Sequence, residues 1–220
     1  MKIKVLLLIL PLLASCSTAK YYTSNVAATE VKDVVLLNPE SNISLVGKDN
    51  KCTYNDSLTT ISEELVKDAI LSNKDKIPVT KTVAVNDKII NQMYSMVSKA
   101  VKSNKKIGTV TIPESIDSLI ESTGSRFGMI VISTGFTRVK GNYGNEIAKG
   151  IGLGILTLGA YYQVPVKSYL NLYVLIADSK DNNITFFRKS SIEDKSPVDE
   201  LVVDKQVLDI FKDYTWTEAK

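Results

Sequence analysis

The clearest pattern of apolar and polar positions lies in the middle of the chain, directly after Asn86. Apolar residues recur there every three or four positions, while lysine and serine occupy the opposite face. The apolar positions are Ile89, Ile90, Met93, Val97, Ala100 and Val101. Asparagine is a favoured N-cap, because its side-chain oxygen accepts a hydrogen bond from a free backbone N–H of the first turn. The pattern therefore predicts an amphipathic helix capped by Asn86.

Three further helices are predicted from the same spacing and from residues that start or end helices. Ser57 is placed to cap a helix over 58–72, Pro113 opens one that ends at Gly124, and Pro197 opens the last. We expect the following apolar residues to face the core: Ile61, Leu65, Ala69 and Ile70 in the first, Ile116, Leu119 and Ile120 in the second, and Leu201, Val202, Leu208 and Phe211 in the last.

Runs rich in β-branched and aromatic residues predict the strands. The expected strands cover 34–37, 43–46, 76–85, 127–139, 169–177 and 184–188. Asn38 and Pro39 close the first run, and Pro78 makes the third an edge strand or an extended segment. A polar turn over 178–183 joins the last two strands as an antiparallel hairpin. This order predicts an α/β (α+β) fold, with a mixed central sheet, a C-terminal antiparallel meander and about four flanking helices.

The N-terminus carries the pattern of an export signal. Lys2 and Lys4 precede an apolar stretch over 5–13. Such a stretch is too short to cross a bilayer as a helix, which needs about 20 apolar residues. Short length with basic flanks is typical of a signal peptide that is removed. The stretch runs directly into Leu13-Ala14-Ser15-Cys16.

These four residues resemble the lipobox of bacterial lipoproteins. The resemblance implies that a diacylglyceryl group is joined to the Cys16 sulfur, that the chain is cleaved before Cys16, and that the new amine is acylated. Several acyl chains, at about 0.8 kcal/mol per buried CH₂, make such an anchor permanent. By the same analogy, Ser17 in place of an aspartate implies the outer membrane, and the absence of an acidic run over 17–22 implies its periplasmic face.

We expect a simple domain organisation. A signal peptide covers 1–15, and a lipidated tether with little apolar periodicity covers 16–33. The remaining residues, 34–216, are of ordinary length for one domain.

Within this domain, residues 147–166 form an apolar, glycine-rich segment. No charged residue lies between Gly150 and Val166, and Lys149 and Lys167 flank the stretch. Its candidate functional residues are Gly150, Gly152, Gly154, Gly159, Tyr161 and Tyr162. A glycine costs a helix about 1 kcal/mol relative to alanine, so close backbone approach has to compensate. Three interpretations stay open: a buried segment packed on the sheet, a membrane element with interfacial tyrosines, or a self-association surface.

The C-terminal half carries a second resemblance. A strand ending in Val-Leu-Ile-Ala-Asp at Asp178, a polar turn, the run Ile-Thr-Phe-Phe-Arg over 184–188 and a terminal helix are similar to the periplasmic domains of curli-secretion and TolB-N-terminal lipoproteins. Asn182 and Asn183 stand where that family has a glycine. The resemblance implies an α/β fold over about 34–215 and a role in envelope assembly or secretion.

The amino-acid composition excludes several classes of function. The chain has 27 basic and 24 acidic side chains, of which the signal peptide contains two lysines, so the mature chain is close to neutral. Nucleic-acid binding would need a strong basic excess and is excluded. The sequence contains no histidine, which removes the commonest general base and a common metal ligand. Gly150-x-Gly152-x-Gly154 lacks the strand–turn–helix setting and acidic partner of a dinucleotide site.

Two remaining features also favour a non-catalytic protein. Acylation of Cys16 leaves Cys52 as the single thiol, which we expect to be a small buried or semi-exposed residue rather than a link between chains. The polar run 178–183 lacks the ligand spacing of a calcium loop. We therefore expect no enzyme activity, no cofactor and no metal.

The expected function is that of a lipid-anchored envelope protein with a periplasm-facing domain. It would serve assembly, transport or secretion by contact with other envelope proteins, its partners being the membrane and those proteins. The alternative is an oligomeric pore-forming or ligand-binding lipoprotein that uses 147–166 as a membrane element.

Overall fold

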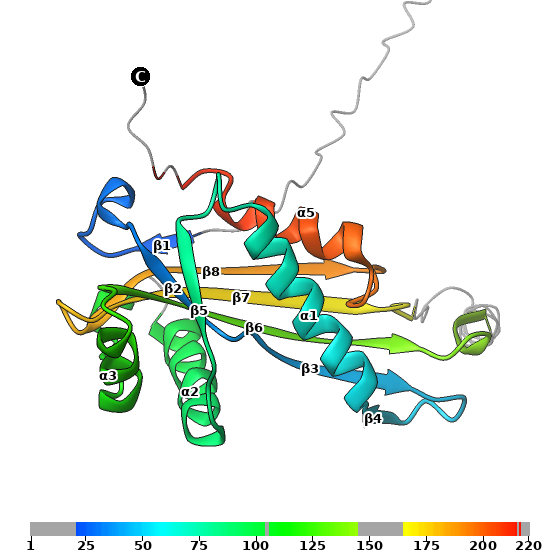
Figure 1. The fold of residues 1–220 in the computed structure, drawn as a ribbon. Coiled ribbons are helices and arrows are strands. Elements are labelled where there is room, and N and C mark those ends of the chain that lie inside the picture. The colour runs from blue at the N-terminus through cyan, green and yellow to red at the C-terminus, as the bar shows by residue number, and fades with distance from the viewer. Residues whose placement is uncertain (1–20, 104–105, 145–164, 215, 217–220) are drawn as a thin grey trace, which may run out of the picture.

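The computed structural model describes residues 21–103, 106–144, 165–214 and 216 (Figure 1). Its strands are β1 (Tyr21–Thr23), β2 (Val34–Leu37), β3 (Glu40–Val46), β4 (Cys52–Tyr54), β5 (Val79–Val83), β6 (Phe127–Arg138), β7 (Tyr169–Asp178) and β8 (Asn183–Glu193). Its helices are α1 (Asp56–Ser72), α2 (Asp87–Ser103), α3 (Glu114–Ser122) and α5 (Glu200–Phe211), with 3-10 turns η1 (Ala28–Glu30) and η2 (Ile107–Thr109).

The strands form one mixed sheet in the order β1-β8-β7-β6-β2-β5, and β3 pairs with both β6 and β4. The strands β6, β7 and β8 make the predicted antiparallel meander, and β2, β3 and β5 add parallel pairings. The predicted α/β (α+β) class with a mixed central sheet is confirmed.

The 12-residue strand β6 organises the sheet, because it pairs with β2 along its first part and with β3 along its second. Leu36 lies opposite Met129, and Glu40 lies opposite Ile132. Four steps along β2 and β3 therefore match three along β6, so the junction at Asn38 and Pro39 holds one extra residue, as in a bulge. Proline suits this place, since it has no N–H to contribute to a ladder.

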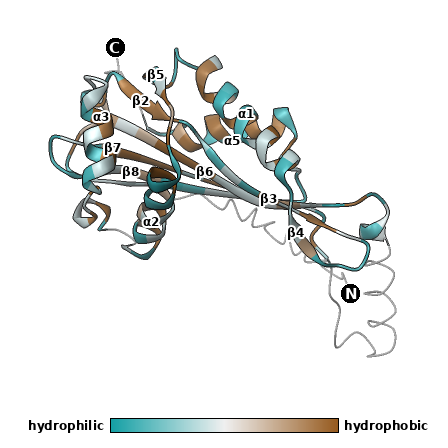
Figure 2. Ribbon diagram, turned by 60° about the horizontal axis from the view of Figure 1, so that its bottom comes forward, coloured by the Kyte–Doolittle hydropathy of each residue, from teal (hydrophilic) through white to brown (hydrophobic). Residues whose placement is uncertain are grey.

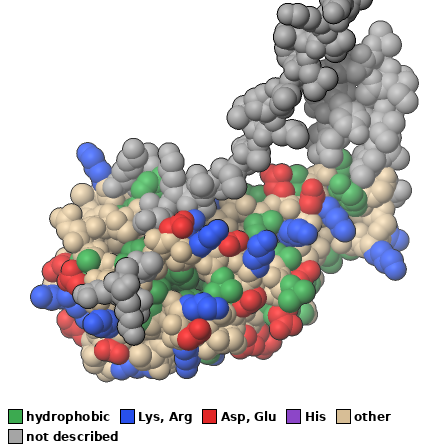
Figure 3. Space-filling view, turned by 90° about the horizontal axis from the view of Figure 1, so that it is seen from above, with side chains coloured by type: hydrophobic (Ala, Val, Ile, Leu, Met, Phe, Trp, Pro, Cys, Tyr) green, Lys and Arg blue, Asp and Glu red, His purple; other side chains and the backbone are tan. Residues whose placement is uncertain are grey.

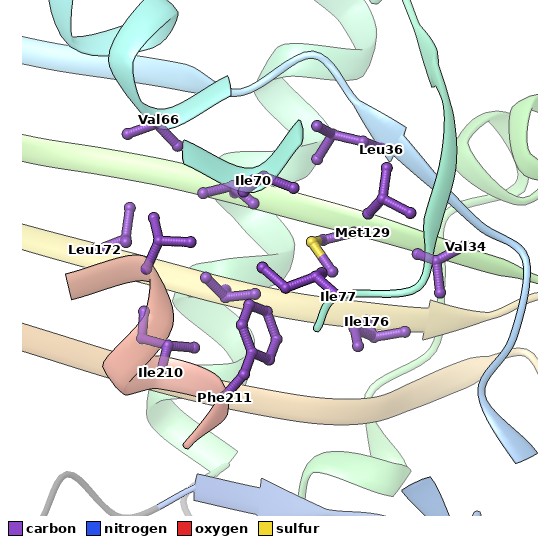
Figure 4. Close-up of a cluster of buried hydrophobic side chains, with 14 of the residues drawn as sticks. Val34, Leu36, Val66, Ile70, Ile77, Met129, Leu172, Ile176, Ile210 and Phe211 are labelled. Carbon is purple, nitrogen blue, oxygen red and sulfur yellow. The ribbon is translucent and has the colours of Figure 1, made fainter. Parts of the chain in front are cut away.

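Helices cover both faces of the sheet (Figure 1). On one face, α1 and α5 pack against alternate residues of β2, β6 and β7, and Figure 4 shows Leu36 and Met129 of the sheet in one apolar cluster with Ile70, Ile210 and Phe211 of the helices. On the other face, α2 and α3 bury the intervening residues of the same strands. Strands buried on both sides are apolar without alternation, as the fully buried run of β2 shows.

The predicted elements are largely present. Asn86 caps α2, since its Oδ1 accepts a hydrogen bond from the backbone N–H of Ile89 at 3.1 Å. The strand β5 pairs only with β2 among the described residues, as expected of an edge strand. β8 extends to Glu193, beyond the predicted end at 188.

The predicted inward faces of α1 and α5 are confirmed in part. Ala69, Ile70 and Phe211 are buried, and Leu65, Val202 and Leu208 are half-buried, but one predicted residue in each helix faces solvent. In α1, Ile61 is 43% exposed, and the buried residues are Thr59, Ser62, Val66, Ala69 and Ile70. The N-cap is Asn55 rather than Ser57. In α5, Leu201 is 82% exposed, and the buried residues are Val203, Gln206, Val207, Ile210 and the predicted Phe211. Both helices bury polar side chains that bond to the sheet, so apolar spacing alone could not orient them.

Part of the expected tether over 16–33 belongs to the folded domain. β1 pairs with β8 in an antiparallel ladder, with Tyr21 opposite Arg188 and Thr23 opposite Phe186. Val31 is fully buried in the core beneath α1 and α5. The folded domain therefore includes residues within 21–33, a range predicted to belong to the tether.

Candidate membrane and assembly interface

The residues that the sequence singled out fall largely outside the described part of the structure. Cys16 and the glycine-rich residues Gly150, Gly152, Gly154, Gly159, Tyr161 and Tyr162 are among those not described. The structure describes the two flanks of that segment, which end at Gly144 and resume at Pro165. The candidate site is therefore built from the residues that hold these flanks.

Arg138, at the end of β6, binds both flanks. Its guanidinium donates from Nε to the carbonyl oxygen of Val166 at 2.9 Å and from Nη1 to Asn142 Oδ1 at 2.8 Å. Nη1 also donates to Asn50 Oδ1, in the turn between β3 and β4, at 3.0 Å. One planar cation thus joins three chain segments that are far apart in sequence.

Asn142 completes this network from a buried position. Its Nδ2 donates to the carbonyl oxygen of Gly47 at 2.8 Å and to Asn50 Oδ1 at 3.2 Å. The β7 flank is held separately, since the backbone N–H of Lys167 donates to Asp194 Oδ1 at 2.8 Å, and the N–H of Asp194 donates to the carbonyl of Ser168 at 2.8 Å. The chain therefore leaves and re-enters the described fold at one fixed place.

We call this place the distal end of the sheet. It comprises 47–51, 138–144, 165–169 and 191–195, where β3, β6 and β8 end and β7 begins. Figure 2 shows β3 and β4 reaching this end beyond α2. Phe136 and Tyr169 stack there with ring centroids 6.4 Å apart, and Arg138 lies 5.8 Å from the Phe136 ring.

Cys52 starts β4 beside the distal end, opposite Val46. The structure shows it as a free, exposed thiol. The expectation of a buried or semi-exposed cysteine was therefore wrong, because all three residues of β4 are exposed on a short edge strand.

A polar contact between α1 and the edge of β3 was not found from the sequence. Glu63 Oε1 accepts a hydrogen bond from the backbone N–H of Ser41 at 3.1 Å, and Thr59 Oγ1 accepts one from the N–H of Ile43 at 3.1 Å. Behind them, Ser62 Oγ lies 3.2 Å from Ser41 Oγ and 2.9 Å from Ser133 Oγ in a buried hydroxyl chain. The only sequence signal for this contact is the row of polar residues on α1.

Carboxylates gather around this edge. Burial raises the pKa of Glu40 to about 7, and the charges of Glu63 and Asp87 add to the effect. Burial also raises the pKa of Glu63, against the hydrogen bond from Ser41. Burial and the same two glutamates raise the pKa of Tyr94 to about 12. Perturbed carboxyls can mark an active site, but here Glu63 is held by a backbone N–H, which gives it a structural role.

Two surface hollows offer little to a small molecule. One, of about 700 Å³, lies between α2 and α3 and includes Lys88, Gln92 and Ser115. Another, of about 390 Å³, lies beside β1 and η2 and includes Lys106 and other polar residues. Small-molecule sites usually have mostly apolar walls, whereas hydroxyl, amide and charged groups dominate both linings. These hollows have the character of solvated surface.

The described residues include neither a cluster of metal ligands nor a membrane-spanning helix. Among them, no group of three histidine, cysteine or acidic side chains is placed to hold a metal ion. Within the same ranges, no helix is both long and apolar enough to cross a bilayer.

No protein-family model and no curated protein matches the chain. Among solved structures, it is similar to the PelC dodecamer from Paraburkholderia phytofirmans, with a TM-score of 0.44, 7% identity, and coverage of 91% of this chain and 99% of that one. It is also similar to the LpoB C-terminal domain from Salmonella enterica, with a TM-score of 0.31, 13% identity, and coverage of 77% and 87%.

A further similarity is to lipoprotein GNA1162 from Neisseria meningitidis, with a TM-score of 0.33, 9% identity, and coverage of 84% of this chain and 100% of that one. These similarities concern the arrangement of helices and strands. The function proposed below therefore rests on the residues of this chain.

Proposed function

We propose that the chain is a lipid-anchored, non-catalytic protein of the bacterial outer membrane, facing the periplasm, that serves assembly, transport or secretion by contact with other envelope proteins. The observation that carries the proposal is Leu13-Ala14-Ser15-Cys16 directly after an apolar export signal. The fold supports it, because β1 starts at Tyr21, five residues after Cys16. Five extended residues span about 18 Å at most, so the anchor holds the domain close to the bilayer.

The absence of histidine from the whole sequence supports a non-catalytic role. Of the two carboxyls with raised pKa values, Glu63 closes a strand edge and Glu40 begins that strand, and neither lines the two hollows. The proposed partners are the membrane and other envelope proteins. These proteins include further copies of this chain, with which it forms a homo-oligomer.

Labelling cells with radioactive palmitate tests the anchor. The natural chain is expected to carry the label and to fractionate with the outer membrane, whereas Cys16→Ala is expected to lose both properties. Cys52→Ala is the matched control and should keep them. Label retained by Cys16→Ala would contradict the proposal. Protease added to intact cells should leave the domain uncut, and digestion there would contradict the periplasmic face.

A second function is favoured by the Arg138 network, which holds both flanks of the undescribed segment at one place. Under this second proposal, the chain is an oligomeric pore-forming or ligand-binding lipoprotein, and residues 147–166 are its membrane element. Deletion of 150–162 tests this alternative. A membrane element predicts an unchanged thermal unfolding transition and loss of any dye release from vesicles, whereas a core segment predicts an unfolded domain.

A further inference from the structure

We infer that the distal end of the sheet faces the bilayer and contacts anionic phospholipid headgroups, so that the long strands stand on the membrane. The inference rests on the proposed lipidation of Cys16 and adds to it the orientation of the domain and a second contact with the membrane.

The direction of β1 is fixed by its antiparallel pairing with β8. Thr23 lies opposite Phe186 and Tyr21 opposite Arg188, so going backward along the chain from Thr23 to Tyr21 leads toward the end of β8. β8 ends at Glu193, which pairs with Tyr169 at the distal end. The backbone of β1, followed from Thr23 to Tyr21, therefore points toward the distal end.

The short chain between Cys16 and Tyr21 limits which end of the sheet the lipid anchor can reach. From Arg188 to Glu193 is five strand residues, or about 17 Å at 3.4 Å per residue. The five residues from Cys16 to Tyr21 span about 18 Å at most, so the lipidated cysteine reaches the distal end if the chain continues straight. A reversal toward the start of β8 at Asn183 would use about four residues in a turn and leave too little chain for the same distance.

Charge distinguishes the two ends of the sheet. The distal end has six basic side chains, five of which are exposed lysines, against three acidic ones. The lysines are Lys48, Lys51, Lys140, Lys167 and Lys195, and the acidic residues are Asp49, Glu193 and Asp194. The opposite end, comprising 30–33, 73–78, 123–126 and 178–182, has five basic and five acidic side chains.

A cluster of lysines next to a lipid anchor is the arrangement that attracts a protein surface to anionic lipid. Figure 3 shows that basic and acidic side chains are interspersed over the broad face formed by α1 and α5. The same end also holds the two flanks of the apolar segment through Arg138 and Asn142. The direction of β1 and the distribution of charge thus both indicate that the distal end faces the membrane.

Cys52 provides the test in the lipidated, full-length mature protein, because Cys16 is thioether-linked there and Cys52 is the remaining thiol, exposed beside the distal end. A maleimide fluorophore on Cys52 is compared with one on Lys180→Cys in a Cys52→Ser background. Lys180 is exposed in the turn at the opposite end. Both proteins are reconstituted into vesicles with 30% phosphatidylglycerol or with phosphatidylcholine alone, and quenching by aqueous iodide is measured.

With phosphatidylglycerol, we expect iodide to quench the Cys52 fluorophore at least threefold less than the Lys180→Cys fluorophore. The protection should shrink without the anionic lipid and in the triple variant Lys48→Glu, Lys51→Glu, Lys140→Glu. Equal quenching at the two positions in vesicles that carry the protein would overturn the orientation and leave the anchor standing. Protein that stays in solution while the vesicles float would overturn the anchor and the orientation together.

Discussion

Glu63 of α1 accepts a hydrogen bond from the backbone N–H of Ser41 in β3, so a helix side chain takes the place of a neighbouring strand. Thr59 does the same for Ile43, and the N–H of Asn55 donates to the carbonyl of Ile43 at 3.0 Å. β4 pairs only with the last three residues of β3, which leaves the first part of that edge open. An open edge is a template for unwanted pairing, and α1 closes it.

Thr59→Val is expected to destabilise the domain by about 1–2 kcal/mol, since it leaves the buried N–H of Ile43 without its acceptor while keeping the side-chain shape. Urea unfolding of the lipid-free Cys16→Ser protein measures the effect. Thr60→Val, at the exposed neighbouring position, is the control and should change the midpoint little. Equal effects of the two variants would show that the edge contact contributes nothing.

Glu40→Gln is expected to stabilise the domain at pH 8 and to change nothing at pH 4. The folded pKa of Glu40 is raised from 4.5 to about 7, so between these values the folded state binds more protons than the unfolded state. Stability from this group therefore falls as the pH rises through that window, and the cost is complete above about pH 7.

Because Glu40 is half-exposed, solvent screening reduces the gain from Glu40→Gln at pH 8 to about 1–2 kcal/mol. Thermal unfolding at several pH values checks the prediction, with Glu121→Gln on the exposed side of α3 as control. A variant whose stability follows the same pH curve as the parent would contradict the assignment.

Asp178→Ala is expected to cost about 2 kcal/mol or more. The carboxylate is fully buried and accepts two hydrogen bonds from Arg126, at 2.8 and 2.6 Å, and one from the N–H of Lys180 at 3.1 Å. The hydrogen bond to Asp178 also raises the pKa of Arg126. Arg126 is partly exposed, so water replaces some of the lost contact.

Asp181→Ala is the matched control for Asp178→Ala. Its carboxylate lies 3.4 Å from the same guanidinium but is 46% exposed, and exposed pairs contribute about 0–1 kcal/mol. Chemical denaturation of the two variants should rank them clearly, and a larger loss for Asp181→Ala would refute the role of burial.

Gly135→Ala is expected to be far more damaging than Gly128→Ala. A methyl group on Gly135 would lie 2.2 Å from the carbonyl oxygen of Tyr169, which is fixed in the β6–β7 ladder. A methyl group on Gly128 would meet side chains rather than backbone, namely Ile120 Cδ1 at 2.5 Å, Ile120 Cγ1 at 2.6 Å and Leu37 Cδ1 at 3.4 Å. The loss is expected to be about 3 kcal/mol for Gly135→Ala and about 1 kcal/mol for Gly128→Ala.

The double variant Gly128→Ala, Ile120→Val separates these two causes. Shortening Ile120 makes room, so the pair should recover part of the stability lost by Gly128→Ala alone, as measured by the urea midpoint. Ile120→Val is not expected to restore stability to Gly135→Ala, because the added methyl group at Gly135 collides with the backbone carbonyl of Tyr169. Failure of any recovery at Gly128 would contradict the packing.

Elements with a strong periodic signal of their own could be predicted from the sequence. The helix after Asn86 and the hairpin around 178–183 have it, since local spacing and turn residues decide them. The inward faces of α1 and α5 could be predicted only in part, because buried polar residues such as Thr59, Ser62 and Gln206 form hydrogen bonds with distant strands. A prediction from the spacing of apolar residues places such polar residues on the solvent-exposed face of the helix.

The sequence by itself determined the mixed α/β class and the exclusion of histidine chemistry, and it carries the resemblance to a lipobox at Cys16, because each depends on residue identity or on short-range spacing. Tertiary structure alone decided that Tyr21 pairs with Arg188, that Arg138 fixes the flanks of the apolar segment, and that α1 closes the edge of β3. These contacts join residues far apart along the chain, and their hydrogen bonds exist only once the sheet has brought the partners together.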